Sequence, residues 1–362
     1  MLNPFKSLKS IIAPSYLGVD IGTTSIKIAE IAKNKKGPKL ENYGILETYG
    51  HLERLNNAIQ TSGLKIMEKE TAELLKLLLR QLKIKSRDVI ASLPAFSAFI
   101  TLLEIPEMSE VDTAKTIPFQ IRQHIPLPVS EVNIDWFKVG QKEEDGFTKQ
   151  QILLISVPND IIQRYQAIFK LAGLSLKILE VETLSLARAL ISGGAEAQAP
   201  TLLVDIGGRS TNIAVVENGF IKYNTHTEFA GGSLTQAISS GLSINIKRAE
   251  ELKKQKGILG GGAELELSTL IFPFLDAIIN EVKRVKTIFE KGQEIGIKRI
   301  ILAGGGANLL GIEKYFEEQT GVETIIGNPF SKVEYPAKIE PMVRELGPSF
   351  GVAIGLGIRE FI

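Results

Sequence analysis

The chain has 362 residues, 44% of them hydrophobic and 23% charged, which suits two or three folded domains of about 150 residues and argues against long disorder. Its formal net charge is only +1, so no overall basic field would attract nucleic acid or anionic lipid. The absence of cysteine excludes disulfides, thiolate catalysis and cysteine-ligated metal centres, and three widely spaced histidines argue against a histidine metal cluster. Glycine is slightly over-represented, at 33 residues, and is clustered.

Residues 1–13 carry an apolar repeat instead of the continuous apolar run of a signal peptide. Apolar residues recur every three or four positions with lysines between them: Leu2, Phe5, Lys6, Leu8, Lys9, Ile11 and Ile12. One interpretation is a short helix that lies on a membrane or a partner. The other, which we favour, is a helix packed on its own domain or a frayed terminus. No apolar stretch in the sequence is long enough to span a membrane, so we expect a cytoplasmic protein.

An internal repeat organises the rest of the chain. Val19–Ala29 recurs 185 residues later as Val204–Ala214, and seven of the eleven positions are identical. Each copy begins with a buried strand that ends in Asp-Ile-Gly, passes through a turn of small residues and enters a second apolar strand. In the second copy, Asn218-Gly219 is a strong signal for a type I′ hairpin. The long spacing predicts two copies of one domain.

The turn of each copy has the residue types that bind phosphate. Glycine lets the backbone approach an oxyanion closely, while N–H and hydroxyl groups donate hydrogen bonds to it. We therefore expect phosphate contacts from Gly22, Thr23, Thr24, Gly207, Gly208, Ser210 and Thr211. The strand-end carboxylates Asp20 and Asp205 are expected to hold Mg²⁺, directly or through water, which bridges to the phosphates. Lys27 is either a phosphate contact or a solvated strand charge, since Asn212 occupies the equivalent position.

Between the two copies, the pattern predicts an inserted β-α-β-β-α unit. Its strands are expected at Phe99–Glu104, Val132–Val139 and Gln151–Val157, and its helices at Val111–His124 and Asp160–Ala172. Pro118 lies inside the first helix pattern, so a kink or a late start near Phe119 is expected. Phe119, Trp136 and Phe137 are expected in the core of the insert.

A third glycine cluster follows a predicted strand at Arg299–Leu302 and precedes a predicted helix from about Leu310 to Thr320. It contains Gly304, Gly305, Gly306 and Asn308. Such a turn lets a flat ring and a sugar approach the backbone, and the helix N-terminus adds partial positive charge. By contrast, Gly260–Gly262 follows a lysine-rich helix and is interpreted as a flexible loop.

These motifs resemble, in order and kind, those of the actin, Hsp70 and sugar-kinase superfamily. Asp20–Lys27 resembles its first phosphate motif, Asp205–Asn212 its second, and Ala303–Gly311 its adenosine motif. The chain as a whole is similar to the PilM family of type IV pilus assembly, relatives of the cell-division protein FtsA, notably in Ile125–Asp135 and Gly347–Gly357. The resemblance implies an α/β, actin-like (ribonuclease H-like) two-domain ATPase fold with a β-α-β-β-α insert of the 1C type.

The resemblance also implies subdomain boundaries and further site residues. The subdomains are 1A at 1–89, 1C at 90–175, a return to 1A with a connecting helix at 176–198, 2A at 199–230, 2B at 231–295, 2A again at 296–340, and a return to 1A at 341–362. Glu250 and Lys253 match a pattern whose Glu and Lys hold ribose or adenine, the alternative being a solvated helix face. Glu182 stands where such ATPases place a water-orienting group, although Thr183 replaces the proline of filament-forming relatives.

The function implied by the resemblance is a cytoplasmic adaptor that binds ATP and Mg²⁺ with at most weak ATPase activity. Its expected partners are the N-terminal peptide of a PilN-like membrane protein, in a groove between 1A and 1C, and other pilus platform proteins, but not nucleic acid. We expect a monomer or weak self-association, held at the inner membrane through partners and aided at most by residues 1–13, not through a broad basic face. The alternatives are an FtsA-like cytoskeletal ATPase and a small-molecule kinase.

Overall fold

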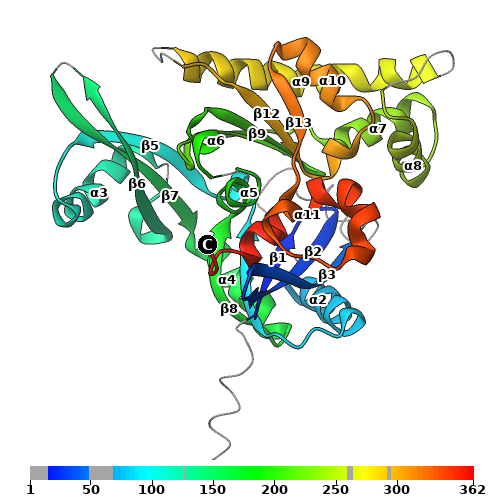
Figure 1. The fold of residues 1–362 in the computed structure, drawn as a ribbon, viewed down its shortest axis with the longest axis horizontal. Helices are drawn as coiled ribbons and strands as arrows, with labels where there is room; N and C mark the ends of the chain where they lie inside the picture. Colours follow the sequence, from blue (N-terminus) through cyan, green and yellow to red (C-terminus); the bar gives the residue numbers. More distant parts are fainter. Residues whose placement is uncertain are drawn as a thin grey trace, which may run out of the picture. The chain divides into compact units, whose positions relative to one another are not determined.

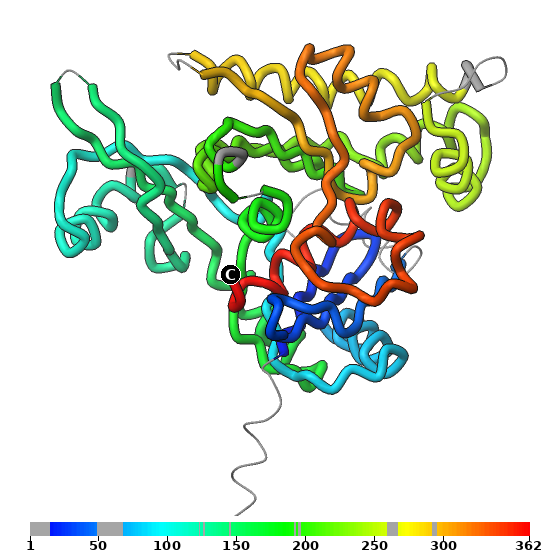
Figure 2. The backbone as a smooth tube through the Cα atoms, viewed as in Figure 1, coloured from blue at the N-terminus to red at the C-terminus, as the bar shows by residue number. Residues whose placement is uncertain are grey.

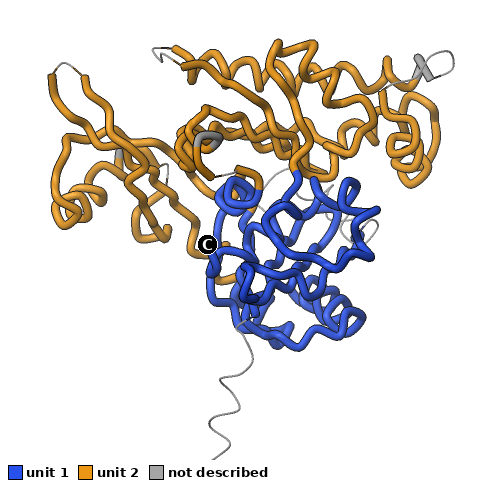
Figure 3. Tube along the Cα trace, viewed as in Figure 1, with its two compact units in different colours: residues 1–93, 165–189, 328–362 blue, residues 94–164, 190–327 orange. Residues whose placement is uncertain are grey.

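The structure is a computed structural model that describes residues 15–48, 68–125, 127–144, 146–191, 193–258, 264–291 and 295–362. The chain forms two compact units, each assembled from separate segments (Figure 3). Unit 1 comprises residues 1–93, 165–189 and 328–362, and unit 2 comprises residues 94–164 and 190–327. The apolar repeat at residues 1–13 and the Gly260–Gly262 loop lie outside the described residues.

The sheet of unit 1 has five strands in the order β3-β2-β1-β4-β8 (Figure 1). The strands are β1 (Ser15–Ile21), β2 (Ser25–Asn34), β3 (Gly37–Glu47), β4 (Asp88–Leu93) and β8 (Ser175–Val181). The first three form an antiparallel meander, and β4 and β8 run parallel to β1. The accompanying helices are α2 (Glu68–Leu82), most of α4 (Asn159–Leu171) and of α5 (Glu182–Leu190), and α11 (Val343–Gly357).

The main sheet of unit 2 repeats this arrangement strand for strand. Its order is β11-β10-β9-β12-β13, with an antiparallel meander of β9, β10 and β11 and with β12 and β13 parallel to β9. The strands are β9 (Thr201–Ile206), β10 (Thr211–Glu217), β11 (Phe220–Thr227), β12 (Arg299–Ala303) and β13 (Glu323–Ile326). The helices are α6 (Ala195–Gln198), α7 (Gly231–Gly241), α8 (Ile246–Lys256), α9 (Glu264–Glu290) and α10 (Ile312–Thr320). The matching sheets confirm the duplication that the sequence repeat predicts.

The insert in unit 2 contains a three-stranded sheet in the order β5-β7-β6, and the elements follow the expected β-α-β-β-α order along the chain, although most of the last helix belongs to unit 1. Its elements are β5 (Phe99–Pro106), α3 (Glu110–His124), β6 (Val132–Glu144) and β7 (Phe147–Pro158), followed by α4. Ile117 and Ile121 of α3 pack with Ile152 and Leu154 of β7 in a buried cluster. The helix therefore covers one face of this sheet.

Two expectations for the insert are wrong. The helix α3 begins at Glu110, where the Ser109 side chain accepts a hydrogen bond from the backbone N–H of Asp112, so the late start near Phe119 is excluded, while a kink at Pro118, which lies inside the helix, stays a prediction. Phe119 is 69% exposed and Phe137 is 40% exposed, whereas Trp136 does pack against the buried cluster. Phe119 lies on the side of α3 that faces away from the sheet, and Phe137 lies on the face of β6 that faces away from α3, so neither side chain enters the interface between helix and sheet.

The C-terminal helix α11 packs very closely on β1, so the last segment of the chain returns to the first strands (Figure 2). A Cβ added at Gly18 would lie 1.9 Å from the carbonyl oxygen of Ala353, and one added at Gly355 would lie 1.9 Å from that of Ser185. Only glycine permits these approaches. Phe350, Ala353 and Ile354 complete the contact as part of a buried cluster. In the described part of the chain, no helix combines the length and apolarity needed to cross a bilayer.

The contact predicts the effect of one added methyl group. Gly18→Ala should destabilise unit 1 by more than the about 1–3 kcal/mol usual for an overpacked core, because backbone and not a flexible side chain occupies the space. Gly193→Ala is the matched control, since nothing lies within 4 Å of the place that its added methyl would occupy and its backbone is unstrained. Urea unfolding of both variants measures the difference. Equal stability of the two would contradict the close packing of α11 on β1.

Candidate functional site

The first strand-end aspartate is held by two neighbouring strands. Asp20, at the carboxyl end of β1, is 7% exposed. Lys27 lies directly opposite on β2, and its Nζ donates to Asp20 Oδ2 at 3.1 Å. Ser92 on β4 donates from Oγ to Asp20 Oδ1 at 2.9 Å. The Lys27 ammonium group therefore contacts Asp20 beside the turn and does not point into solvent. Its positive charge neutralises the aspartate.

The two repeated turns have the same backbone geometry. In each, the N–H of the first glycine donates to the carbonyl of the serine three residues on, Gly22 to Ser25 and Gly207 to Ser210, both at 3.0 Å. A Cβ at Gly207 would lie 2.8 Å from the Ser210 carbonyl oxygen, so this position of the turn has no room for a side chain. The other predicted phosphate-binding residues at the turns are partly exposed: Thr23, Thr24, Gly208 and Ser210. Their polar groups are available to a ligand.

Glu182 and Asp20 lie at the same edge of the unit 1 sheet. Glu182 begins α5 directly after β8, and because β1, β4 and β8 are parallel, their carboxyl ends meet at one edge. In open α/β sheets, ligands bind at this edge. The structure thus brings the predicted water-orienting acid to the side of the sheet that carries the predicted metal ligand.

Tyr165 is a residue of this region that sequence reasoning missed. It lies on α4, is 1% exposed, and its hydroxyl has no hydrogen-bond partner among the described residues. Burial raises the pKa of Tyr165, and the nearby carboxylates of Asp20 and Glu182 raise it further. No sequence signal distinguishes this tyrosine from a core aromatic, because it follows the apolar face of its helix. A buried hydroxyl without a partner costs stability, which makes it a candidate ligand contact.

In unit 2, the third glycine cluster packs against the second turn. Asp205 on β9 is level with Ala303 on β12, and a Cβ at Gly304 would lie 2.4 Å from Asp205 Oδ1. A Cβ at Gly306 would lie 2.3 Å from the Ile206 side chain. The cluster continues as a short 3₁₀ turn from Gly305 to Asn308, and α10 begins only at Ile312. This turn therefore separates the α10 N-terminus, which was expected to face the ligand, from the glycine cluster.

The structure also connects the second turn to Glu250 and Lys253. The N–H groups of Gly231 and Gly232, at the start of α7, donate to the carbonyls of Gly207 and Gly208 at 3.0 and 2.8 Å. Lys253 Nζ donates to the Gly231 carbonyl at 2.9 Å, to Thr235 Oγ1 at 2.8 Å, and pairs with Glu250 at 2.6 Å. All three ammonium protons thus have acceptors in unit 2. Contact of Glu250 or Lys253 with ribose or adenine stays a prediction.

The charges of this pair are set by burial and by each other. Burial lowers the pKa of Lys253, against the opposing effect of the Glu250 carboxylate. Burial alone would raise the pKa of Glu250, but the Lys253 charge and hydrogen bonds from Lys253 and Thr235 hold that pKa below its ordinary value.

Thr211 makes a structural hydrogen bond in this state: it is fully buried, and its hydroxyl donates to the Phe229 carbonyl at 2.7 Å. Its phosphate contact also stays a prediction.

A second group that the sequence did not reveal joins this turn to the insert. The Arg209 guanidinium carbon lies 5.4 Å from the ring centroid of Phe96, and the Phe96 ring lies 6.3 Å from the ring of His226. Phe96 belongs to the short 3₁₀ turn Ala95–Ser97 that leads into β5. Arg209 was hard to find because the first copy has Thr24 at the equivalent position. The Arg209 guanidinium of the second turn therefore contacts the segment that leads into the insert.

Lys222 fixes the insert to the same sheet at another point. From β11, its Nζ donates to the Val139 carbonyl on β6 at 2.7 Å and to Gln151 Oε1 on β7 at 2.9 Å. A Cβ at Gly140 would lie 2.6 Å from this Nζ, so the glycine makes room for the ammonium group. Burial lowers the pKa of Lys222. The insert and the second hairpin are thus held together at two places inside unit 2.

The residues present suit a magnesium nucleotide better than a metal held by protein alone. Among the described residues, no group of three or more His, Asp or Glu side chains could enclose a metal ion, and each hairpin offers one aspartate. Mg²⁺ is usually bound by one or two carboxylates together with water and phosphate oxygens. The Tyr165 hydroxyl, which has no hydrogen-bond partner among the described residues, also fits a bound polar ligand.

Known proteins resemble this chain over most of its length. A solved PilM-PilN type IV pilus biogenesis complex contains a chain that is 22% identical, with a TM-score of 0.82, covering 96% of this chain and 98% of that one. MreB5 of Spiroplasma citri bound to ADP has a TM-score of 0.54 at 15% identity, covering 96% of each chain. The cell division protein FtsA of Enterococcus hirae is 23% identical over 343 residues, which cover 85% of this chain and 76% of FtsA.

These likenesses confirm the expected fold class, an actin-like α/β architecture of two domains. The sequence family described as type IV pilus assembly protein PilM matches residues 18–361, nearly the whole chain. The expected resemblance is thereby confirmed, and the chain belongs to the PilM family of type IV pilus assembly proteins.

Proposed function

We propose that this protein is an ATP-binding adaptor of the type IV pilus inner-membrane platform, with slow or no ATP hydrolysis. The observation that carries the proposal is the pair of matching turns, each closed by the same glycine-to-serine hydrogen bond and preceded by a strand-end aspartate. Family membership supports the role in pilus assembly. The related complex with PilN supports a PilN-like membrane protein as partner, which would keep the adaptor at the cytoplasmic face of the inner membrane.

In this proposal, the turns supply N–H and hydroxyl donors to the phosphates, and Asp20 and Asp205 hold the metal directly or through water. Bound Mg²⁺ neutralises phosphate charge and orients the phosphate oxygens. Lys27 is placed to exchange Asp20 for a phosphate, since its Nζ lies 3.7 Å from the position of a Cβ at Gly22. Glu182 would orient a water near the terminal phosphate, which is a positioning role and suits weak hydrolysis.

The metal role of the aspartates predicts a loss of nucleotide affinity in isosteric variants. Asp20→Asn and Asp205→Asn should each weaken Mg-ATP binding about tenfold or more, because a carboxylate ligand to the metal is lost. Titration calorimetry with Mg-ATP, repeated with excess EDTA, measures the effect. Asp88→Asn is the control, since Asp88 lies at the other end of β4 and pairs with Lys177 at 3.3 Å. Unchanged affinity in both site variants would refute the proposed ATP site.

Tyr165→Phe separates a ligand contact from a packing role. If the hydroxyl donates to a water or to the bound nucleotide, its removal should weaken Mg-ATP binding about two- to tenfold while the ligand-free protein is at least as stable as the parent. Calorimetry and thermal unfolding supply the two readouts. Tyr335→Phe is the control, since that hydroxyl donates to Glu340 at 2.8 Å at the surface of unit 1. Unchanged affinity with raised stability would show that Tyr165 serves packing alone.

The contact of Arg209 with Phe96 predicts that nucleotide and partner affect each other. A peptide covering the cytoplasmic N-terminus of the PilN-like protein should bind with an affinity that changes about fivefold or more on addition of Mg-ATP. Arg209→Ala should reduce this nucleotide effect, because it removes the cation–π contact between the second turn and the entrance to the insert. Fluorescence anisotropy of labelled peptide measures both affinities.

Arg248→Ala is the control for this experiment, because Arg248 is exposed on α8 and pairs only with Glu251 among the described residues. No peptide binding under any condition would refute the proposed partner. Peptide binding with a full nucleotide effect in Arg209→Ala would instead refute coupling through Phe96.

A further inference from the structure

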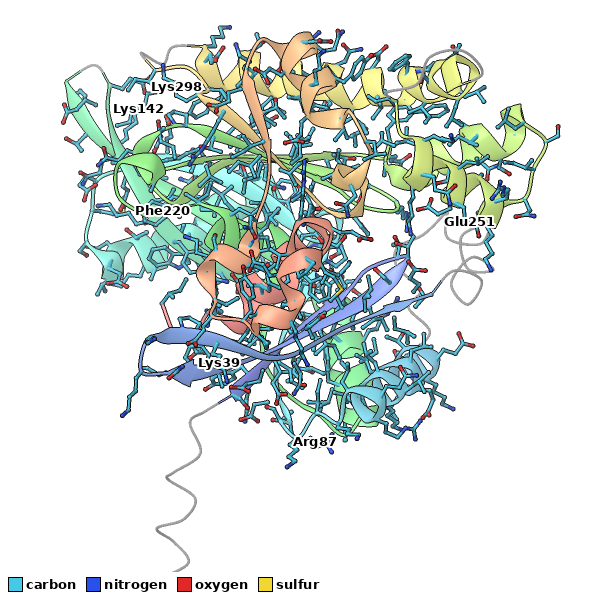
Figure 4. The ribbon with its side chains drawn as sticks, turned by 45° about the vertical axis from the view of Figure 1, so that its right-hand side comes forward. Lys39, Arg87, Lys142, Phe220, Glu251 and Lys298 are labelled. Atoms are coloured by element: carbon cyan, nitrogen blue, oxygen red, sulfur yellow. The ribbon has the colours of Figure 1, made fainter. Side chains whose placement is uncertain are left out.

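The end of the unit 1 sheet remote from Asp20 is strongly basic. β1 begins there at Ser15, which is paired with Ala32 of β2, and Ser86 Oγ donates to the Ser15 carbonyl at 2.9 Å. The β2–β3 turn, the end of α2 and the loop into β4 all lie at this end of the sheet. Figure 4 labels Lys39 and Arg87 there. We name as the basic edge the cations on these segments: Lys33, Lys35, Lys36, Arg80, Lys83, Lys85 and Arg87.

The charge of the basic edge is not cancelled by neighbouring acids. Among the described residues, none of its seven cations has a carboxylate within the 4.0 Å of an ion pair. Two acids on the same segments are paired with cations outside the basic edge, Asp88 with Lys177 at 3.3 Å and Glu41 with Lys39 at 2.8 Å. Glu334 accepts from the neutral Asn34 amide at 2.9 Å and keeps its negative charge, which is one charge against seven cations. The edge therefore carries an excess of positive charge that is open to an external anion.

Part of this edge surrounds a cavity of about 410 Å³. Its rim is formed by Lys76, Arg80, Lys83 and Arg87, and its floor by Leu79, Ile84 and Ala172. No acidic side chain lines it. Lys76 pairs with Glu73 at 2.8 Å, whereas the other three cations stay available. Because Leu79, Ile84 and Ala172 are only 5–6% exposed, the cationic rim is the part of the cavity that suits a phosphate group.

We propose that the basic edge is a docking surface for anionic phospholipid, and that the cavity takes a lipid phosphate. The sequence directly before Ser15 points the same way, because residues 1–13 combine an apolar repeat with Lys6 and Lys9. The near-zero net charge predicted no broad basic face, but a net charge sums over all faces and conceals a local excess on one of them.

Lipid docking at this edge leaves the nucleotide turns free. β1 is 7 residues long, so the basic edge and the Gly22 turn lie about 20 Å apart along the strand. The inference does not rest on the proposed ATP site, and its test can be run without nucleotide.

The test is co-sedimentation of the full chain with vesicles of phosphatidylglycerol and phosphatidylethanolamine, compared with vesicles of neutral phosphatidylcholine alone. The parent protein should bind the anionic vesicles, and binding should fall when salt is raised from about 0.1 M to about 0.5 M, since the attraction is screened. The triple variant Arg80→Gln, Lys83→Gln, Arg87→Gln should lose about tenfold or more of its partition onto anionic vesicles.

The matched control is Lys247→Gln, Lys291→Gln, Lys298→Gln, which removes the same charge from exposed positions in unit 2. It should bind as the parent does, and thermal unfolding should show both triple variants folded. Equal vesicle binding by the two triple variants, or equal binding of the parent to neutral vesicles, overturns the proposal. Binding to a short DNA duplex but not to anionic vesicles would also overturn it, in favour of a nucleic-acid surface.

Discussion

The hydrogen bond that closes each repeated turn is the constraint on which the candidate site depends. It fixes the backbone between the strand that ends in aspartate and the strand that follows, at 3.0 Å in both units. The same bond leaves no room for a Cβ at Gly207, while the partly exposed residues after the glycine keep their N–H and hydroxyl groups available. If the turns bind phosphate as proposed, the site is preorganised, so little conformational entropy would be lost when a ligand binds. Two such turns in two units of the same topology account for the sequence identity between the two halves of the chain at this segment.

The surroundings of the two turns differ. The first turn belongs to a carboxyl edge that also carries Ser92, Glu182 and the buried Tyr165 hydroxyl. The second turn is bonded to α7 and reaches the insert through Arg209 and Phe96. A ligand that moves Arg209 therefore acts on the segment that leads into β5. Lys222 holds the insert to β11 independently of this contact.

The sequence identity between the two copies made the repeated hairpins predictable from the sequence. The contacts of single side chains were not predictable. The repeat at Val19–Ala29 predicts the same antiparallel strand pair in both units, β1–β2 and β9–β10, because a duplicated sequence buries the same faces, whereas the order of the other strands could be found only in the fold. The burial of Phe119 and Phe137 was predicted wrongly, because hydrophobicity alone does not indicate whether a residue faces the interface between α3 and the sheet or faces away from it. Tyr165 and Phe96 escaped notice because their importance lies in neighbours that are far away in sequence. The sequence predicts a nucleotide contact for Lys253, whereas its three acceptors could only be found in the fold.

The parallel strands of unit 1 also separate two kinds of charge. Their carboxyl ends carry Asp20 and Glu182, and the opposite end carries the basic edge. In the proposed functions, nucleotide phosphates would bind at the turn and its metal, and lipid phosphates at the lysine and arginine side chains of the opposite end. A net charge of +1 is compatible with carboxylates at one end of this sheet and an excess of cations at the other. If the basic edge docks on lipid as proposed, membrane attachment would have a second source besides a protein partner, and two weak attachments that act together hold a protein at a surface far better than either alone.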